Sequence, residues 1–544
     1  MRVKCKKSVM LPASLLALSL IISGCTSSSS IDANRSPART QRTLRINGDN
    51  LGFPQPYAVS TQGRAYLYMS LIFDTLTWKD HDGVVSLLAQ NWTISADNRT
   101  WTFKLVPNAR FHDGIPVTAS DVKFSFDYMK THPNQWVQLN MLQSATVVDS
   151  QTVEIVLTDP YAPFLTNVAG IVPILPQHLW RDVVDPIRFT APEAAIGSGP
   201  FKLTSFDSAT GTYIYQANTD YFPGAPQVDR IIYAPNSNSN AALLNGDLDV
   251  AQNLSYAQSQ ALATNPDYRV AEGPGLFIVR LYFNFDLPEF QNTAVRQAFC
   301  HAINRSEIIR KALNGAGTMG NPGYVSPDSI WYNPDVTQYA FDTARANELL
   351  DHNGMMDTNG DGTREYNGRP MRYTLITNGN YQDEALLIQS YLKAVGINVT
   401  LSTVSQSTLN SNIQGGAFQL ALSGHGSMGG DPVMLAHFVN PAATLGTTSS
   451  VTRQGGALWG NATFDDVFER QLSEMDDVRR RVLVNRLQQI LADELPTLPL
   501  YYGRMTVAWN PATLNGWFFT FGGAGPSVPT AQNKLVFIRG RWGR

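Results

Sequence analysis

Residues 371–404 restrict the fold more than any other stretch, because a strand, a helix and a second strand follow one another there. Met371 to Thr377 is a short apolar segment typical of a buried strand. Gln382 to Val395 has apolar residues at helical spacing, ends before Gly396, and is followed by a strand from Ile397 to Val404. Parallel strands need such a crossover connection, so the order predicts an α/β domain.

A further strand, Phe418 to Leu422, continues this pattern and leads into a glycine-rich turn. Asp431 and Pro432 then begin a helix. Open α/β sheets hold ligands at the carboxyl ends of their strands, so we expect this turn to face a ligand. Its glycines allow a ligand to approach the backbone closely, and they are Gly424, Gly426, Gly429 and Gly430.

The same turn also resembles a nucleophile elbow, in which Ser427 would be the nucleophile of a serine hydrolase. The elbow requires glycine two residues before the serine, and this chain has His425 there. His437 is the only histidine after the serine, so no acid and base pair follows it. We therefore predict a binding protein and not an enzyme, with no catalytic residue, no cofactor and no metal.

The start of the chain is typical of a targeting segment. A basic stretch and an apolar run end in small residues before Cys25. This ending resembles the lipobox of bacterial lipoproteins, which predicts a signal peptide over residues 1–24 and a lipidated Cys25. Residues 25–43, with four consecutive serines, are expected to form a flexible tether. We expect a protein of the periplasm or cell surface that is anchored to the membrane by lipid.

The remaining length is too great for one core and predicts two or three domains. The chain has 41 basic and 44 acidic residues, and the leader removes four basic ones and no acidic one, so the mature net charge is about −7. Nucleic acid is therefore not an expected partner. Cys300 is the one cysteine left after processing at Cys25, so no internal disulfide is expected, and we predict a buried helical position for it.

Three smaller motifs carry further predictions. Thr118 and Asp121 form a capping box for a helix over residues 122–129. Asp357 to Gly362 resembles the start of a calcium loop, but the twelfth position is Gly368, so we predict a tight turn without metal. The arginines at positions 479–481 are expected on a solvated helix face.

Motifs in a consistent order resemble those of the family 5 extracellular solute-binding proteins, the peptide, dipeptide and nickel receptors of ABC importers. They are Leu87–Met129, Gly197–Leu203, Tyr221–Phe222, Leu244–Asp249, Ala294–Phe299, Asp357–Pro370, Leu392–Val404 and Leu498–Tyr502. The start of the mature chain departs from the family pattern at Gly52 to Tyr57.

The resemblance implies a two-lobed, periplasmic-binding-protein type II-like cleft fold of the α/β class with an additional inserted domain. Lobe I would comprise residues 44–57, 196–276 and 500–544, the inserted domain residues 58–195, and lobe II residues 277–499. The implied function is capture of short peptides by a monomer that delivers them to an ABC permease. Alternative ligands are a nickel chelate or an oligosaccharide, and a role in signalling instead of transport is a further alternative.

In the peptide-binding members an aspartate in a similar context holds the peptide's ammonium group, and Asp431 is the matching residue. An aspartate followed by proline is also a favoured helix N-cap, so Asp431 is expected to cap its helix, to bind an ammonium group, or to do both. For the far end of a peptide, Arg453 and His425 lie nearest in sequence. The expected ligand-binding residues are His425, Ser427, Met428, Gly429, Gly430, Asp431 and Arg453.

Overall fold

The computed structural model describes residues 41–60, 63–137, 139–426, 430–439, 459–528 and 530–543. The chain divides into two compact units, residues 1–41 and 42–544, and the helices and strands below belong to the second. The predicted signal peptide, Cys25 and most of the tether lie outside the described residues. In the part of the chain that is described, no helix has the length and apolar character needed to cross a bilayer.

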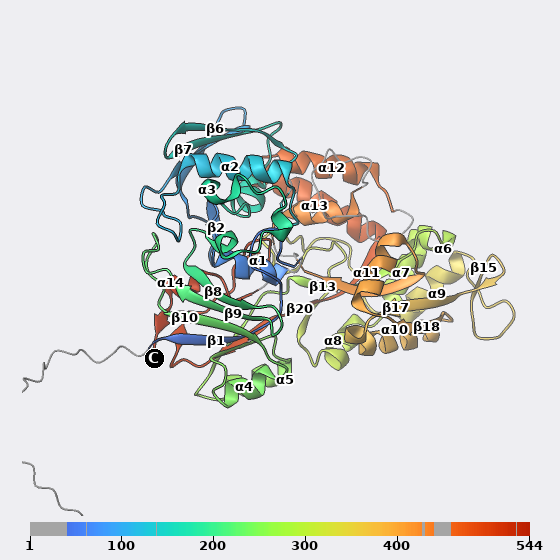
Figure 1. The fold of residues 1–544 in the computed structure, drawn as a ribbon. Helices are drawn as coiled ribbons and strands as arrows, with labels where there is room; N and C mark the ends of the chain where they lie inside the picture. The colour runs from blue at the N-terminus through green and yellow to red at the C-terminus, as the bar shows by residue number, and fades with distance from the viewer. Residues whose placement is uncertain are drawn as a thin grey trace, which may run out of the picture. The chain divides into compact units, whose positions relative to one another are not determined.

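Three sheets contain most of the strands (Figure 1). The seven-stranded sheet has the order β12 (Arg269–Glu272), β21 (Thr506–Trp509), β11 (Val250–Gln252), β1 (Thr43–Gly48), β10 (Arg230–Pro235), β9 (Thr212–Ala217) and β8 (Phe201–Asp207). The six-stranded sheet has the order β14 (Gly317–Met319), β20 (Thr497–Gly503), β13 (Phe277–Phe283), β19 (Leu420–His425), β17 (Arg372–Thr377) and β18 (Asn398–Thr403). The four-stranded sheet has the order β4 (Ala89–Ile94), β5 (Thr100–Leu105), β7 (Thr152–Leu157) and β6 (Leu142–Asp149).

Helices connect and cover these sheets. The longer ones are α1 (Gly63–Ser70), α2 (Ala119–Thr131), α5 (Tyr256–Ala263), α7 (Thr293–Ala302), α8 (Arg305–Ala312), α9 (Thr343–His352), α10 (Gln382–Ala394), α11 (Gln406–Gly415), α12 (Ala462–Ser473) and α13 (Asp477–Glu494). Shorter elements include β2 (Thr77–Lys79), which pairs with β3 (Val84–Ser86), the π-helical turn η1 (Leu165–Ala169) and the 3-10 helix η5 (Pro432–Phe438).

The predicted strand, helix and strand unit is confirmed by β17, α10 and β18. The two strands pair in parallel, from Arg372 opposite Asn398 to Thr377 opposite Thr403. β19 also runs parallel to β17, so its last residue lies at the same edge of the sheet as the ends of the other two strands. β19 runs to His425, beyond the predicted end at Leu422, because its antiparallel pairing with β13 continues that far.

Two smaller structural predictions, the capping box and the buried Cys300, are also confirmed. α2 begins after the capping box, where the backbone N–H of Thr118 donates to the Asp121 carboxylate at 2.9 Å. The capping box thus satisfies a backbone donor that the first turn of a helix cannot pair internally. Cys300 lies in α7 and is 1% exposed, and burial raises the pKa of its thiol.

Two large hydrophobic cores stabilise the second unit. One lies between the six-stranded sheet and the helices α7, α9 and α10, with Leu281, Phe299 and Leu375 among its members. The other joins the seven-stranded and four-stranded sheets, and α12 and α13 contribute Phe464 and Leu487 to it. The backbone N–H of Ala162 donates to the Leu472 carbonyl oxygen at 2.7 Å, so α12 contacts the segment before η1, which is far away in sequence.

Candidate functional site

The end of β19 leads into the predicted glycine-rich turn, and two of its glycines differ in their surroundings. A Cβ atom at Gly424 would lie 2.5 Å from the Phe277 ring and 2.8 Å from the Ile278 carbonyl oxygen. At Gly426 the nearest such atom is 3.8 Å away. Gly424 is therefore required by packing within the sheet, whereas a Cβ atom at Gly426 would make only an ordinary van der Waals contact with the described residues.

His425 is held in one tautomer by its neighbours. Its Nδ1 lies 2.9 Å from the Gly426 carbonyl oxygen and its Nε2 lies 2.6 Å from the Tyr324 hydroxyl. Because a carbonyl oxygen only accepts, Nδ1 carries the proton and the tyrosine donates to Nε2. The ring of His437 lies 4.7 Å away. Burial, and then His437 and Arg280, lower the pKa of His425 well below its ordinary value, so the imidazole is neutral.

Arg280 places a permanent positive charge beside these histidines. It lies in β13 and is 2% exposed. Its guanidinium carbon lies 4.3 Å from the ring centroid of Tyr282, 5.0 Å from that of Tyr324 and 5.6 Å from that of Phe438. Cation–π contacts in a desolvated site contribute about 2 kcal/mol. The charge also acts on His437, because burial and then Arg280 lower the pKa of that side chain to about 3.

Asp431 caps its helix and is also held in a buried ion pair. Its Oδ1 accepts the backbone N–H of Val433 at 3.0 Å, and Pro432 takes the first position of η5. The guanidinium of Arg480 donates to both carboxylate oxygens, at 2.6 and 2.5 Å. The two side chains are 7% and 3% exposed. A ligand ammonium would therefore have to share this carboxylate with an arginine and a helix cap.

The prediction of a solvated arginine triplet is wrong for Arg480. Its guanidinium also donates to the Gln471 side chain at 2.9 Å and lies 5.0 Å from the Trp331 ring centroid. Arg480 precedes Val484 by one helical turn and so lies on the buried face of α13, where spacing by four residues brings side chains together. Its neighbour Arg479 does face solvent, being 69% exposed.

The other predicted contacts have mixed outcomes. Gly430 packs so closely on the C-terminal segment that a Cβ atom there would lie 2.0 Å from the Ser527 hydroxyl oxygen. The structure thus brings His425, Gly430 and Asp431 into buried or half-buried positions. The remaining predicted contacts lie outside the described residues, and these are Ser427, Met428, Gly429 and Arg453.

Lys79 was not among the predicted residues, although it lies near Asp431. It ends β2 and is 6% exposed, and its ammonium donates to the Gly525 carbonyl oxygen at 3.3 Å. Burial lowers the pKa of Lys79 to about 8, and the Asp431 carboxylate acts in the opposite direction. No local pattern reveals this position, because a lysine before Asp-His-Asp-Gly is typical of an exposed strand end.

The calcium-like turn brings Asp357, Asp361 and Glu365 close enough to share an ion. Glu365 accepts hydrogen bonds from Thr358 and Asn359, and the Asp357 carboxylate accepts two backbone N–H groups. These internal bonds are those of a closed turn, so the turn is explained by its own hydrogen bonds.

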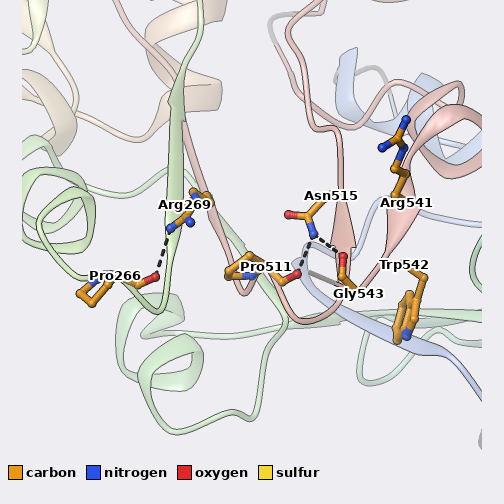
Figure 2. Close-up of a pocket in the computed structure, with 7 residues that line it drawn as sticks. All are labelled: Pro266, Arg269, Pro511, Asn515, Arg541, Trp542 and Gly543. Carbon is orange, nitrogen blue, oxygen red and sulfur yellow. Dashed lines mark hydrogen bonds between the residues drawn. The ribbon is translucent and has the colours of Figure 1, made fainter.

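A separate hollow of about 500 Å³ lies beside Arg269, the first residue of β12, and the segment that follows β21 (Figure 2). Asn515 donates to the carbonyl oxygens of Pro511 and Gly543 at 2.6 and 2.9 Å, and Arg269 donates to that of Pro266 at 3.1 Å. These polar groups are thus engaged with the backbone around the hollow. The hollow has none of the residues that surround the glycine-rich turn.

Comparison with known proteins adds a family and a fold. The family model of bacterial extracellular solute-binding proteins, family 5, middle region, matches residues 83–443. The dipeptide-binding protein DppE of Bacillus subtilis is 25% identical over 527 residues, which cover 90% of this chain and 92% of DppE. A putative ABC transporter peptide-binding protein of Brucella ovis is 33% identical over 353 residues, and the match spans 62% of this chain and 63% of that relative.

Solved structures resemble the chain over nearly its whole length. NikA of Brucella suis, in complex with Fe(III)-EDTA, has a TM-score of 0.77 at 23% identity and covers 90% of this chain and 99% of its own. AppA of Bacillus subtilis, in complex with a nonapeptide, has a TM-score of 0.73 at 23% identity, with 93% and 100% covered. These likenesses confirm the predicted α/β fold of the type II periplasmic-binding-protein class.

Proposed function

Because the chain belongs to the bacterial extracellular solute-binding proteins of family 5, we propose that it captures short peptides for an ABC importer and has no catalytic activity of its own. The observation that carries this proposal is the match to a dipeptide-binding protein over 90% of the chain. Peptide-binding relatives from a second genus support the same ligand class. The family description itself implies a location in the periplasm or outside the cell.

Capture works by closure of two lobes around the peptide. Lobe I comprises residues 44–57, 196–276 and 500–544, lobe II residues 277–499, and the inserted domain residues 58–195. The strand order supports this division, because the seven-stranded, six-stranded and four-stranded sheets draw their strands mainly from lobe I, lobe II and the inserted domain, respectively. Hinge closure buries the ligand and presents one closed shape to the permease, provided that the peptide binds the closed state better than the open one.

The protein acts as a monomer on a lipid tether. Signal peptidase cleavage before Cys25 and acylation of its thiol place the binding lobes at the membrane surface, within reach of the permease. Palmitate labelling in cells tests this anchor. The wild type should be labelled and sediment with membranes, and Cys25→Ser should be unlabelled and soluble. Labelling of Cys25→Ser would show that the anchor is elsewhere.

A metal chelate is the second candidate ligand. The observation that favours it is the neutral imidazole of His437, whose buried Nδ1 has no hydrogen-bond partner in the described part of the chain, because neutral imidazole is a common metal ligand. A nickel–histidine chelate is therefore included in the test of function.

Thermal unfolding of the purified protein with a library of di- to pentapeptides tests the proposal. Binding to the folded state alone raises the melting temperature, so a subset of peptides should raise it, and calorimetry should give a one-to-one stoichiometry. Nickel–histidine and cello-oligosaccharides are the comparison ligands. A rise with either of these and with none of the peptides would contradict the peptide assignment.

A further inference from the structure

Lys79 has a buried ammonium group with fewer partners than such a group requires. The residue is 6% exposed. In the described part of the chain its Nζ makes one hydrogen bond, to the Gly525 carbonyl oxygen at 3.3 Å, and it joins no ion pair. An ammonium has three donors, and a buried charge is costly unless it is paired and hydrogen-bonded. The side chain thus has unused capacity for an acceptor with negative charge.

The charges around Lys79 do not balance. Among the described residues, the Asp431 carboxylate is the charged group whose field acts on it. That carboxylate already holds the Arg480 guanidinium through two hydrogen bonds, at 2.6 and 2.5 Å. The three side chains therefore carry two positive charges and one negative charge. A single anionic group would neutralise the cluster, and a cation would increase the imbalance.

Lys79 also lies where separate parts of the chain meet. It belongs to β2, in the inserted domain, and its ammonium contacts Gly525 of the C-terminal segment. Ser527 of that same segment packs against Gly430, next to Asp431 in lobe II. Residues 525–527 thus connect the Lys79 ammonium to the turn that was predicted to bind the ligand. The position and charge of Lys79 together indicate that its ammonium contacts a ligand.

We propose that Lys79 binds a carboxylate of the captured ligand and so selects ligands with a free carboxylate group. The inference rests on the proposed function as a peptide receptor. In a peptide the group is the C-terminal carboxylate or an acidic side chain, and both offer the same charge-assisted hydrogen bond. The Asp431–Arg480 pair stays intact, and the ligand carboxylate supplies the missing negative charge.

Calorimetry with three peptides tests the selection for a free carboxylate on the unmodified protein. Trialanine should bind at least about tenfold more tightly than trialaninamide, because the amide leaves the buried ammonium unpaired. Ala-Glu-Ala-amide distinguishes the two sources of the carboxylate, since it should recover the lost affinity only if Lys79 accepts an acidic side chain. Equal affinity for all three peptides would overturn the inference and leave the peptide function standing.

Variants of Lys79 provide a second test of the inference. Lys79→Met keeps the aliphatic stem and should bind trialanine and trialaninamide equally, whereas Lys79→Arg should keep the preference for the acid. Lys393→Met, at an exposed position of α10, is the matched control and should behave as the wild type. If Lys79→Met retains the full preference, the inference is wrong. If that variant does not fold, the peptide comparison on the wild type decides.

Failure of the proposed peptide function gives a different result from failure of the Lys79 inference. If none of the peptides binds, the peptide assignment is wrong, and succinate then tests Lys79 directly. A rise in melting temperature with succinate in the wild type that is absent in Lys79→Met would uphold the carboxylate site. The same succinate response in both proteins, including no response in either, would overturn it.

Discussion

Replacing Asp431 by asparagine should destabilise the folded protein, because the change removes one charge of a buried ion pair. Asparagine keeps an oxygen that can still accept the Val433 N–H, so the helix cap survives. What is lost is the charge opposite Arg480, which is 3% exposed. Of its hydrogen-bond partners in the described part of the chain, the Gln471 side chain and the Gln471 carbonyl would remain. Breaking a buried pair on one side costs about 3–5 kcal/mol.

Equilibrium unfolding in urea measures this loss. Asp431→Asn should lower the free energy of unfolding by about 3–5 kcal/mol. Asp431→Ala should lower it by about 1 kcal/mol more, because alanine also removes the cap. Asp466→Asn is the matched control, since Asp466 is 65% exposed and its partner Arg470 lies 3.4 Å away on the surface. Exposed pairs of this kind contribute little, so its stability should barely change.

A double substitution separates the interaction between Asp431 and Arg480 from the other effects of each single change. Arg480→Met should be about as harmful as Asp431→Asn, because it leaves the carboxylate buried alone. The two changes together should cost less than the sum of the single changes, as expected for residues in contact. If Asp431→Asn unfolds like the wild type but no longer binds free-amine peptides, the carboxylate serves the ligand and our interpretation of the ion pair is refuted.

Further predictions concern other buried groups. Lys534→Met should cost about 3–5 kcal/mol in urea unfolding, because its ammonium and the Asp74 carboxylate form a pair that is 0% exposed on both sides, 2.6 Å apart. Acidification should destabilise the protein through His437, whose folded pKa of about 3 lies below the unfolded value of about 6.5. The unfolded chain binds the extra proton between these values, so stability falls by up to about 1.4 kcal/mol per pH unit, and His437→Asn should flatten this slope in unfolding at pH 4–6. Gly424→Ala should cost about 1–3 kcal/mol by overpacking, because the new methyl carbon would lie 2.5 Å from its nearest neighbour. Gly426→Ala should cost much less, because that distance is 3.8 Å there. Equal melting temperatures of the two variants would contradict the prediction.

Much of the fold could be predicted from local patterns. The spacing of apolar residues in β17, α10 and β18 depends on the period of each element and not on distant contacts, and all three elements lie within two residues of their predicted bounds. The end of β19 lies beyond its predicted position, because Gly424 and His425 pair with Val279 and Ile278 of β13, which lie far away in sequence. Long-range pairing has no local signature, so strand ends are less predictable than strand positions.

The candidate site was harder to predict, since burial there comes from tertiary contacts. Asp431 was correctly expected to cap a helix, because the cap is formed by neighbours in sequence. The ion pair with Arg480 could not be predicted, because the two residues are 49 positions apart. The burial of Arg480 could have been, because this residue shares one face of α13 with Val484, Leu487 and Leu491. Lys79 gave no such signal, because its contact with Gly525 spans 446 residues.

Mass spectrometry of the protein under native conditions, directly after purification from cells, tests the central claim of peptide capture. We predict a protein peak with an added mass of a few hundred daltons, which dissociates on denaturation into short peptides that fragment to amino-acid sequences. An added mass that fragments as a sugar or a metal chelate, together with no peptide bound from an added library, would contradict it.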